Sequence, residues 1–198
     1  MMRQADAARS ESMEALIISG EPAAGKTTVA GILAKRLGIR SIGGGEILKE
    51  LAKDQGYEPG GEEWWDTEEG IRFLKQRETD PEFDIEADRR MKKRIDSGNV
   101  IITSYTAPWI SEKGFKVWLK CSAGMRAERM SKRDHFPMSS TRRTVALRDK
   151  ENYELYKKLY HIEFGKDLSP FDIIIDTADK GPEQVADLII DSWGKANK

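Results

Sequence analysis

The segment Gly20–Thr28 constrains this chain more than any other part of its sequence. It reads GEPAAGKTT and fits the pattern G-x-x-x-x-G-K-[ST]. Glycines let the backbone turn tightly, so that consecutive N–H groups point into one concavity and bind phosphate oxygens. A helix that begins at about Gly25 adds the positive end of its dipole to this concavity. The segment is therefore predicted to be a phosphate-binding loop.

The residues of this loop have distinct predicted roles. Lys26 is expected to reach the β- and γ-phosphates of ATP as a catalytic cation, and the Thr27 hydroxyl is placed to hold Mg²⁺. The alternative is an ordinary glycine-rich turn. It is weak, because an apolar run comes directly before the loop and an amphipathic stretch directly after it. The predicted ATP-binding residues are Gly20, Glu21, Pro22, Ala23, Ala24, Gly25, Lys26, Thr27 and Thr28.

Short apolar runs alternate with helix-like stretches along the whole chain. The runs are continuous, as is typical of strands buried on both faces of a parallel sheet. Strands that alternate with helices predict βαβ units. The predicted strands are Ala15–Ser19, Ile39–Ile42, Val100–Thr103, Phe115–Leu119 and Phe171–Ile175, and the predicted helices cover about 25–37, 45–55, 66–77, 82–97, 123–134, 140–161 and 183–194. With the phosphate loop, this order predicts an α/β chain of the P-loop NTPase fold, with helices on both faces of a five-stranded parallel sheet.

Composition excludes several other classes of protein. Of 198 residues, 38% are hydrophobic and 34% charged, and the net charge of −1 argues against a nucleic-acid coat or a membrane-surface protein. One cysteine and two histidines exclude a disulfide scaffold and argue against a zinc site. No apolar run approaches the roughly 20 residues that cross a bilayer. Residues 1–13 also lack the apolar core of a signal peptide. We expect a cytoplasmic monomer with small-molecule partners and neither membrane nor nucleic-acid partners.

Charge is unevenly distributed over the chain. Residues 1–13 are a polar tail that is predicted to be disordered, and residues 14–198 are predicted to form a single domain. Within that domain, residues 58–88 carry 12 acidic and 3 basic side chains, whereas residues 125–148 carry 7 basic and 2 acidic ones. Such runs are often solvated helix faces. The basic run nevertheless lies on a predicted helical hairpin near the ligand edge of the sheet.

Two helical stretches carry candidate substrate residues. The glycine-rich turn 43–45 opens a helix with Lys49 one turn in, at the sheet edge where ligands of α/β proteins bind. Asp84 and Asp88 lie four residues apart, on one helix face with two arginines alongside. The alternatives are a solvated lysine and a surface ladder of salt bridges. The predicted substrate residues of these stretches are Lys49, Asp84, Asp88, Arg89 and Arg90.

The basic hairpin is predicted to act as a lid. A mobile element that carries arginines can neutralise charge on a transferred phosphoryl group and exclude water. The arginines of this hairpin are Arg126, Arg129, Arg133, Arg142, Arg143 and Arg148.

Several motifs together resemble one known family. The chain contains GEPAAGKTTVAGILAKRLGI, SIGGGEILKELAKDQG, DPEFDIEADRRMKKRIDSGNVII, FKVWL, RAERMSKRD and DLSPFDIIIDT. It thereby resembles the archaeal-type cytidylate kinases, nucleoside monophosphate kinases related to adenylate kinase, over residues 14–193. The resemblance implies a five-stranded core, a helical monophosphate-binding region at about 43–98 and a lid at about 132–150. The implied reaction is ATP plus CMP or dCMP, with Mg²⁺, giving ADP and the corresponding diphosphate.

The resemblance also implies roles for particular residues. The loop would bind ATP, and the Asp84–Arg90 stretch would face the acceptor nucleotide. Two arginines would begin the lid and a third would return toward the phosphates. With Lys26, the implied catalytic residues are Arg129, Arg133 and Arg148.

The chain departs from the family pattern at two places. Lys49 stands where the family usually has an arginine that faces the monophosphate, and a lysine lacks the bidentate fork of a guanidinium group. Thr103-Ser104-Tyr105 stands where the family has Glu-Gly-Arg. That glutamate would lie near the metal, and that arginine would contact the acceptor. Tyr105 is therefore a further candidate substrate residue.

Two other functions remain open from the sequence. One is a kinase on the same core with a different acceptor, including another nucleoside monophosphate. The other is a nucleotide-dependent binding or assembly factor with weak ATPase activity, acting on RNA. A further hypothesis concerns Trp64 and Trp65, which lie in an acidic segment at 57–80. One of them could stack on the acceptor nucleotide, or both could pack within their own segment.

Overall fold

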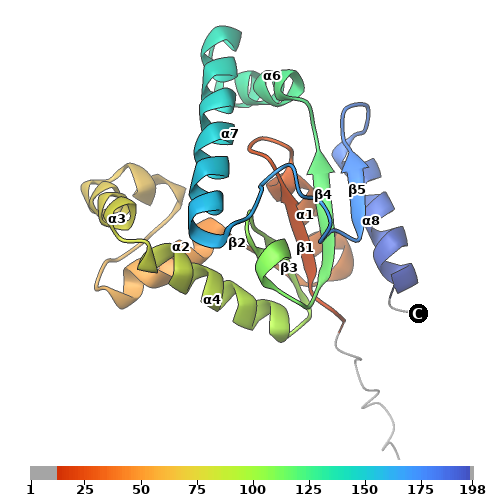
Figure 1. Cartoon of the computed structure of the whole chain (residues 1–198), viewed down its shortest axis with the longest axis horizontal. Coiled ribbons are helices and arrows are strands. Elements are labelled where there is room, and N and C mark those ends of the chain that lie inside the picture. The colour runs from red at the N-terminus through yellow and green to blue at the C-terminus, as the bar shows by residue number, and fades with distance from the viewer. Residues whose placement is uncertain (1–12, 197–198) are drawn as a thin grey trace, which may run out of the picture.

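A five-stranded parallel sheet forms the centre of the chain, whose computed structural model describes residues 13–196 (Figure 1). The strand order is β2-β3-β1-β4-β5, and each neighbouring pair is parallel. This confirms the predicted sheet. The strands are β1 (Leu16–Gly20), β2 (Arg40–Gly43), β3 (Val100–Thr103), β4 (Phe115–Lys120) and β5 (Ile173–Asp176).

Helices connect these strands and cover both faces of the sheet. Each of the seven predicted helices is present, and the short elements η1 and α5 were not predicted. The helices are α1 (Lys26–Leu37), α2 (Gly44–Asp54), η1 (Glu62–Asp66, a 3₁₀ helix), α3 (Glu68–Thr79), α4 (Glu82–Asp96), α5 (Ala107–Ile110), α6 (Ala123–Asp134), α7 (Met138–Tyr160) and α8 (Pro182–Ala196).

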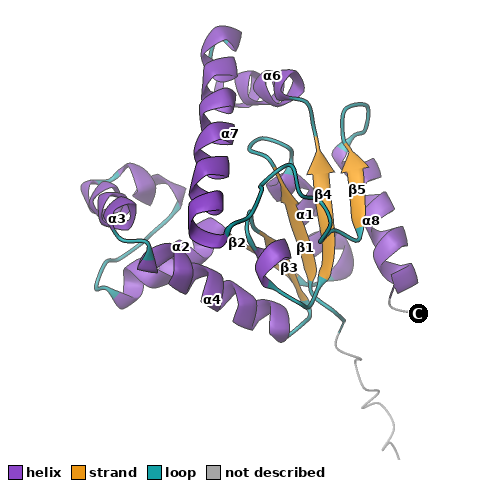
Figure 2. Ribbon diagram, viewed as in Figure 1, coloured by secondary structure: helices purple, strands orange, loops and turns teal. Residues whose placement is uncertain are grey.

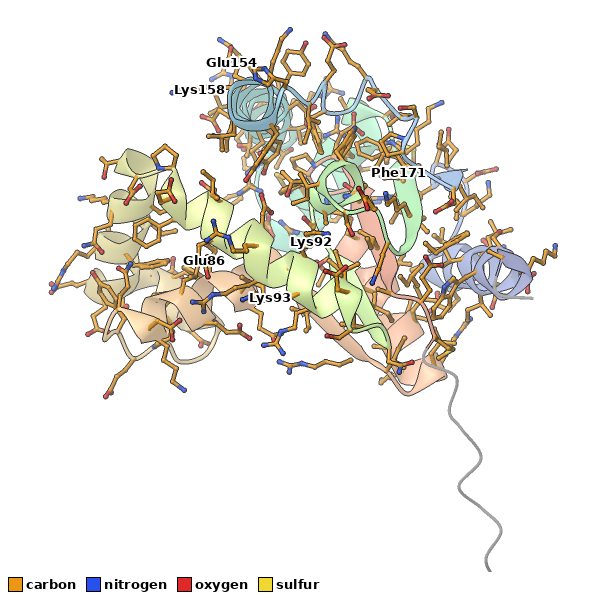
Figure 3. The ribbon with its side chains drawn as sticks, turned by 60° about the horizontal axis from the view of Figure 1, so that its bottom comes forward. Glu86, Lys92, Lys93, Glu154, Lys158 and Phe171 are labelled. Carbon is orange, nitrogen blue, oxygen red and sulfur yellow. The ribbon has the colours of Figure 1, made fainter. Side chains whose placement is uncertain are left out.

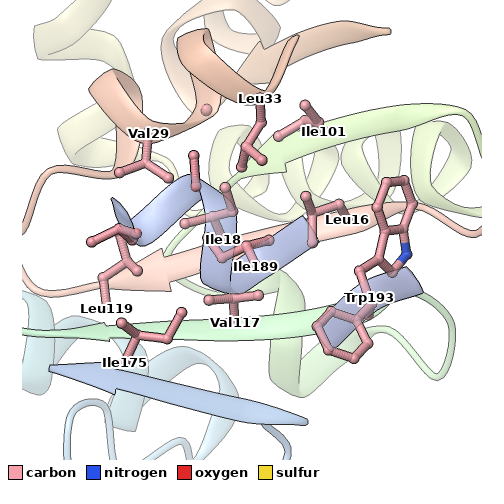
Figure 4. Close-up of a cluster of buried hydrophobic side chains, with 14 of the residues drawn as sticks. Leu16, Ile18, Val29, Leu33, Ile101, Val117, Leu119, Ile175, Ile189 and Trp193 are labelled. Atoms are coloured by element: carbon pink, nitrogen blue, oxygen red, sulfur yellow. The ribbon is translucent and has the colours of Figure 1, made fainter. Parts of the chain in front are cut away.

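The central strand β1 separates two hydrophobic cores. Its five residues are all buried, and successive side chains point to opposite faces. Leu16 and Ile18 pack on the face covered by α1 and α8, where Figure 4 shows them beside Val29 and Leu33. Ile17 packs on the other face, with residues of α2 and α4. Burial on both faces explains why the strands are continuous apolar runs.

Two groups of helices flank the sheet, one on the side of β2 and one beside the carboxyl ends of the strands (Figure 2). Helices α2, α3 and α4 lie together, with α2 against β2 and α4 against β3, and α7 stands beside them (Figure 2). Helices α6 and α7 pack side by side as the predicted hairpin. The range predicted as a lid, 132–150, comprises the end of α6, a turn and the first half of α7.

Several predicted boundaries differ from the structure. The last strand begins at Ile173 rather than Phe171, because Phe171 closes a turn with Leu168 and packs its ring on Trp109 and Trp118. Most of the predicted tail lies outside the described residues, but Met13 is described and exchanges two hydrogen bonds with Asn99. Within residues 13–196, no helix is long and apolar enough to span a membrane.

Candidate active site

The phosphate loop joins β1 to α1 through three residues with positive φ, Gly20, Ala23 (φ 63°) and Gly25. Gly20 has φ 151°, and a Cβ atom there would lie 2.6 Å from the carbonyl oxygen of Leu119. Gly25 has φ 102° and precedes the first turn of α1. Since side-chain-bearing residues adopt such backbone conformations at a cost, glycine is required at both ends of the turn. The local chemistry thus favours the tight concavity that the sequence predicts.

Lys26 lies inside this concavity. Its Nζ donates to the carbonyl oxygens of Gly20 (2.7 Å) and Glu21 (2.9 Å), and it lies 4.5 Å from the centre of the Tyr105 ring. Burial lowers the pKa of Lys26 to about 7. An anionic ligand in the loop would favour the charged form. The loop is therefore electrostatically suited to phosphate.

Two cavities meet at the loop. The smaller one, here the small cavity, has a volume of about 590 Å³ and lies between the loop, α6 and the segment after β5. The large cavity, about 810 Å³, is walled by residues of α2, α3, α4 and α7. The residues that line both cavities are Lys26, Thr27, Tyr105 and Arg148. A group that passes from one cavity to the other would pass these four side chains.

Arg129 connects two walls of the small cavity by hydrogen bonds. Its guanidinium donates to Ala24 O (3.2 Å) in the loop, and to Thr177 Oγ1 (3.0 Å) and O (2.6 Å) after β5. Arg133 also lines this cavity, but it is exposed and forms an ion pair with Asp134 (2.6 Å). The structure thus brings two of the predicted lid arginines to the loop, and Arg148 joins them from α7.

Acidic side chains line the large cavity. Asp88 accepts hydrogen bonds from Thr106 Oγ1 and Tyr160 Oη, both at 2.6 Å, and burial raises its pKa. Asp84 accepts from both Nε (3.1 Å) and Nη2 (2.6 Å) of Arg77, which belongs to α3. The cavity therefore presents a carboxylate and a guanidinium group side by side.

Three predicted substrate residues do not line the large cavity. Lys49 donates to the carbonyl oxygens of Gly60 (3.2 Å) and Gly61 (2.8 Å). Arg89 and Arg90 both pair with Glu86, which Figure 3 shows projecting from α4, and Arg90 also pairs with Asp54 of α2.

The helical repeat explains this division on α4. Residues three and four apart share a face, so Asp84 and Asp88 face the cavity together with Ala87 and Met91. Arg89 and Arg90 turn away from that face, and the contacts of Arg90 run to α2. For this pair, the alternative of a salt-bridge ladder describes the structure.

The structure adds residues that sequence reasoning missed. Arg77 was only one of three basic residues in the acidic stretch, and neither Thr106 nor Tyr160 carried a signal in the sequence. Arg126 belonged to the basic hairpin, but no separate role was predicted for it. Of the predicted ATP-binding residues, Gly20 and Glu21 line neither cavity, and Glu21 lies 3.8 Å from Arg126.

The two adjacent tryptophans pack within their own segment. Trp64 is buried among Tyr57, Phe73 and Phe83, and Trp65 is half-buried with its ring centre 4.9 Å from that of Trp64. The 3₁₀ geometry of η1 brings both rings to one cluster. Neither ring lines the large cavity, so the structure favours packing over stacking on a ligand.

No group of three or more His, Cys, Asp or Glu side chains among the described residues could hold a metal ion. The Thr27 hydroxyl, at the point where the two cavities meet, is the available protein ligand in the loop. Mg²⁺ commonly keeps several waters and is held by substrate phosphates together with one or two protein oxygens. These residues fit a cation that arrives with the nucleotide.

Comparison with known proteins places the chain in a family. The model of the cytidylate kinase-like family matches residues 16–179. The chain belongs to this family. It is 34% identical to a cytidylate kinase of Pyrococcus abyssi, over 86% of this chain and 88% of that protein. It is 32% identical to one of Methanopyrus kandleri, over 82% of this chain and 84% of that protein. The resemblance predicted from the motifs is thereby confirmed.

Solved structures support the fold of this cytidylate kinase-like chain. A protein from Eubacterium ventriosum matches with a TM-score of 0.65 at 17% identity, covering 91% of this chain and 98% of that one. Shikimate kinase from Acinetobacter baumannii matches with a TM-score of 0.56 at 18% identity, covering 95% and 96%. At these identities the likeness concerns the fold alone, which is that of P-loop kinases.

Proposed function

We propose that the chain is an ATP-dependent phosphotransferase that transfers the γ-phosphoryl group of ATP to CMP or dCMP. The observation that carries this proposal is the meeting of two cavities at Lys26, Thr27, Tyr105 and Arg148. A hydrolase needs one nucleotide site, whereas a kinase needs a second site within reach of the same phosphates. The names of the cytidylate kinases that it resembles support the choice of acceptor.

The small cavity would take ATP. Backbone N–H groups of the loop, at residues 23–28, would hold its phosphates, and Lys26 would leave the loop carbonyls to contact the β- and γ-phosphates. Mg²⁺, held by Thr27 and the phosphates, would supply charge neutralisation when bound. Arg129 would fix the wall of the cavity, because it ties the loop to the segment after β5.

The large cavity would take the monophosphate nucleotide. The paired Arg77 and Asp84 side chains offer a donor beside an acceptor. Cytosine presents the complement: its N4 amine can donate to a carboxylate, and its N3 and O2 can accept from a guanidinium group. Arg148 and Lys26 would then meet the phosphate end of the acceptor. This pairing favours cytosine over uracil, whose N3–H would face the arginine.

Transfer in this site requires positioning more than base chemistry. An oxygen of the acceptor monophosphate forms a bond to the γ-phosphorus, and the bond to the β–γ bridging oxygen breaks to release ADP. Lys26 and Arg148 would neutralise the negative charge as it is redistributed. The surrounding cavity walls would orient the two nucleotides for in-line transfer.

One observation favours the second candidate, a nucleotide-dependent factor with weak ATPase activity. Thr103 ends β3 and Ser104 follows it, and neither is acidic, so no carboxylate from this strand reaches the metal position. ADP release with ATP alone and with CMP, dCMP, UMP, AMP and GMP separates the two. We expect turnover to depend on CMP or dCMP; hydrolysis that ignores the acceptor would support the factor.

Lys26→Ala provides the control for that assay. Removing the fixed charge should lower turnover by about 100-fold or more while the protein stays folded. The matched variant is Lys35→Ala on the exposed side of α1, which should keep wild-type turnover. We further propose that the enzyme works as a cytoplasmic monomer on small-molecule substrates only, as expected from its composition.

A further inference from the structure

A buried arginine joins three segments around the phosphate loop. Arg126 of α6 is 2% exposed. Its Nε donates to Cys121 O (3.1 Å) at the end of β4, and its Nη1 donates to Pro22 O (3.2 Å) in the loop. The same guanidinium holds Asp149 of α7 in two bonds, Nη1 to Oδ1 (2.8 Å) and Nη2 to Oδ2 (2.7 Å).

The partner of this arginine adjoins a residue of the proposed active site. Asp149 follows Arg148 on α7, and Arg148 lines both cavities. Among the described residues, the Arg148 side chain forms no hydrogen bond or ion pair with another side chain or with the backbone. Its place over the loop is therefore set by the position of α7.

Few apolar side chains hold the part of α7 around Arg148. The core shared by α6 and α7 consists of Ala127, Met130 and Val145, with Ala23 and Met138 against it. The next buried residue of α7 is Tyr156, more than two turns further along. Asp149 lies between them, where directional bonds rather than a hydrophobic core fix the helix.

We propose that Arg126 and Asp149 are positioning residues that fix Arg148 over the phosphate loop. This inference rests on the proposed kinase function. Only the Arg126 side of this ion pair is buried, since the Asp149 side chain is 32% exposed. Desolvation of the guanidinium offsets much of the attraction, so the pair is weak evidence for a stabilising role and fits a directional one. The planar guanidinium bonds the loop and α7 at once, and thereby sets the distance between the phosphates and Arg148.

A double-mutant cycle tests this role. Asp149→Asn keeps the shape of the side chain but weakens the bidentate pair, and should lower kcat roughly 10-fold or more with little change in KM for either substrate. Arg148→Ala should lower kcat by a similar or larger factor. If Asp149 acts through Arg148, adding Asp149→Asn to the Arg148→Ala protein should change kcat less than about twofold.

Two further variants separate positioning from folding. Arg126→Lys keeps the charge but loses the fork, and should reproduce the kcat loss of Asp149→Asn. Asp187→Asn removes a carboxylate from the exposed Arg36–Asp187 pair and should leave kcat unchanged. Thermal unfolding of each variant identifies any that fail to fold. If only one of Asp149→Asn and Arg126→Lys folds, that variant is combined with Arg148→Ala in the double-mutant cycle.

The outcomes are distinct. Independent effects of Asp149→Asn and Arg148→Ala, or unchanged kcat in folded Asp149→Asn and Arg126→Lys proteins, would overturn the positioning role. If the wild-type protein does not phosphorylate CMP, the proposed function fails on its own. The same double-mutant cycle is then measured on the rate of ATP hydrolysis, because Arg148 lies beside the loop in hydrolysis as in phosphoryl transfer to CMP.

Discussion

At the scale of single residues, Lys26 combines two opposing requirements. It must be charged to hold phosphates, yet burial lowers its pKa to about 7 from a usual value near 10.5. Its bonds to two loop carbonyls and its position over the Tyr105 ring partly compensate the desolvation. Occupation of the loop by phosphates would restore the charged form. Nucleotide binding near neutral pH is therefore expected to take up protons.

The depressed pKa of Lys26 also predicts how stability depends on pH. Between about pH 7 and pH 10.5 the unfolded chain binds a proton at Lys26 that the folded one does not, so this residue's contribution to the unfolding free energy rises with pH. Lys26→Met removes the buried charge. The free energy of unfolding of the variant should exceed that of the wild type most below pH 7. The difference between the two should shrink toward pH 10. Urea unfolding across this range measures it; a constant difference would contradict the low pKa.

Asp84 carries the second residue-scale prediction. If its carboxylate accepts from the cytosine amine, Asp84→Asn should lower kcat/KM for CMP by roughly 10- to 100-fold, because a buried hydrogen-bonding group loses its match. KM for ATP should stay within about twofold. Asp96→Asn, on the same helix in an exposed pair with Lys92, is the control. Equal losses for CMP and ATP would show that Asp84 supports the fold rather than the base.

At the scale of elements, η1, α3 and the start of α4 form a small aromatic unit that packs on Leu51 and Ala52 of α2. Trp64, Phe73 and Phe83 are its buried rings, and Thr67 caps α3 by accepting from Gly70 N. The sequence indicated a helix here and an aromatic pair of uncertain role. The 3₁₀ turn that gathers both indoles into one cluster was not predicted, because short 3₁₀ elements lack a periodic pattern.

Trp64 should be the centre of that unit. Trp64→Ala removes a buried indole and should lower the free energy of unfolding by about 3 kcal/mol or more, whereas Trp64→Phe should cost less. Because the unit forms a wall of the large cavity, KM for CMP should rise more than KM for ATP. Urea unfolding and acceptor titrations check both. Full stability in Trp64→Ala would place the ring outside the cluster.

At the scale of the whole molecule, the sheet and its loop followed from the sequence more directly than the acceptor side. Continuous apolar runs and G-x-x-x-x-G-K-[ST] predicted the strands and the loop, since both depend on local residue types. The Asp88–Tyr160 bond joins residues 72 positions apart, and Arg77–Asp84 joins two helices across the turn between them, so no helical or strand repeat encodes either contact. Lys49, Arg89 and Arg90 were expected at the substrate, but the structure places them in contacts outside the cavity.

The Tyr160–Asp88 hydrogen bond connects the end of α7 to α4. Tyr160→Phe removes the 2.6 Å bond from the end of α7 to α4, while Asp88 keeps Thr106. We expect CMP to tighten the binding of an ATP analogue in the wild type, and this enhancement to fall roughly two- to fivefold in the variant. Calorimetric titrations with and without CMP measure it, and the control is Tyr153→Phe, at a residue of α7 that lines neither cavity. An unchanged enhancement would exclude the bond from the coupling.

Helix α7 gives this coupling a mechanical meaning. Its 23 residues make a rod about 35 Å long. Near its middle the helix is joined to the phosphate loop through Arg126, which bonds both Asp149 and Pro22 O, and at its end Tyr160 bonds Asp88 of α4. A rigid helix with two such contacts moves as one body. A displacement at one contact therefore also displaces the other. Binding of either nucleotide would therefore change the affinity for the other. Thermodynamic reciprocity requires that each changes the affinity of the other by the same factor.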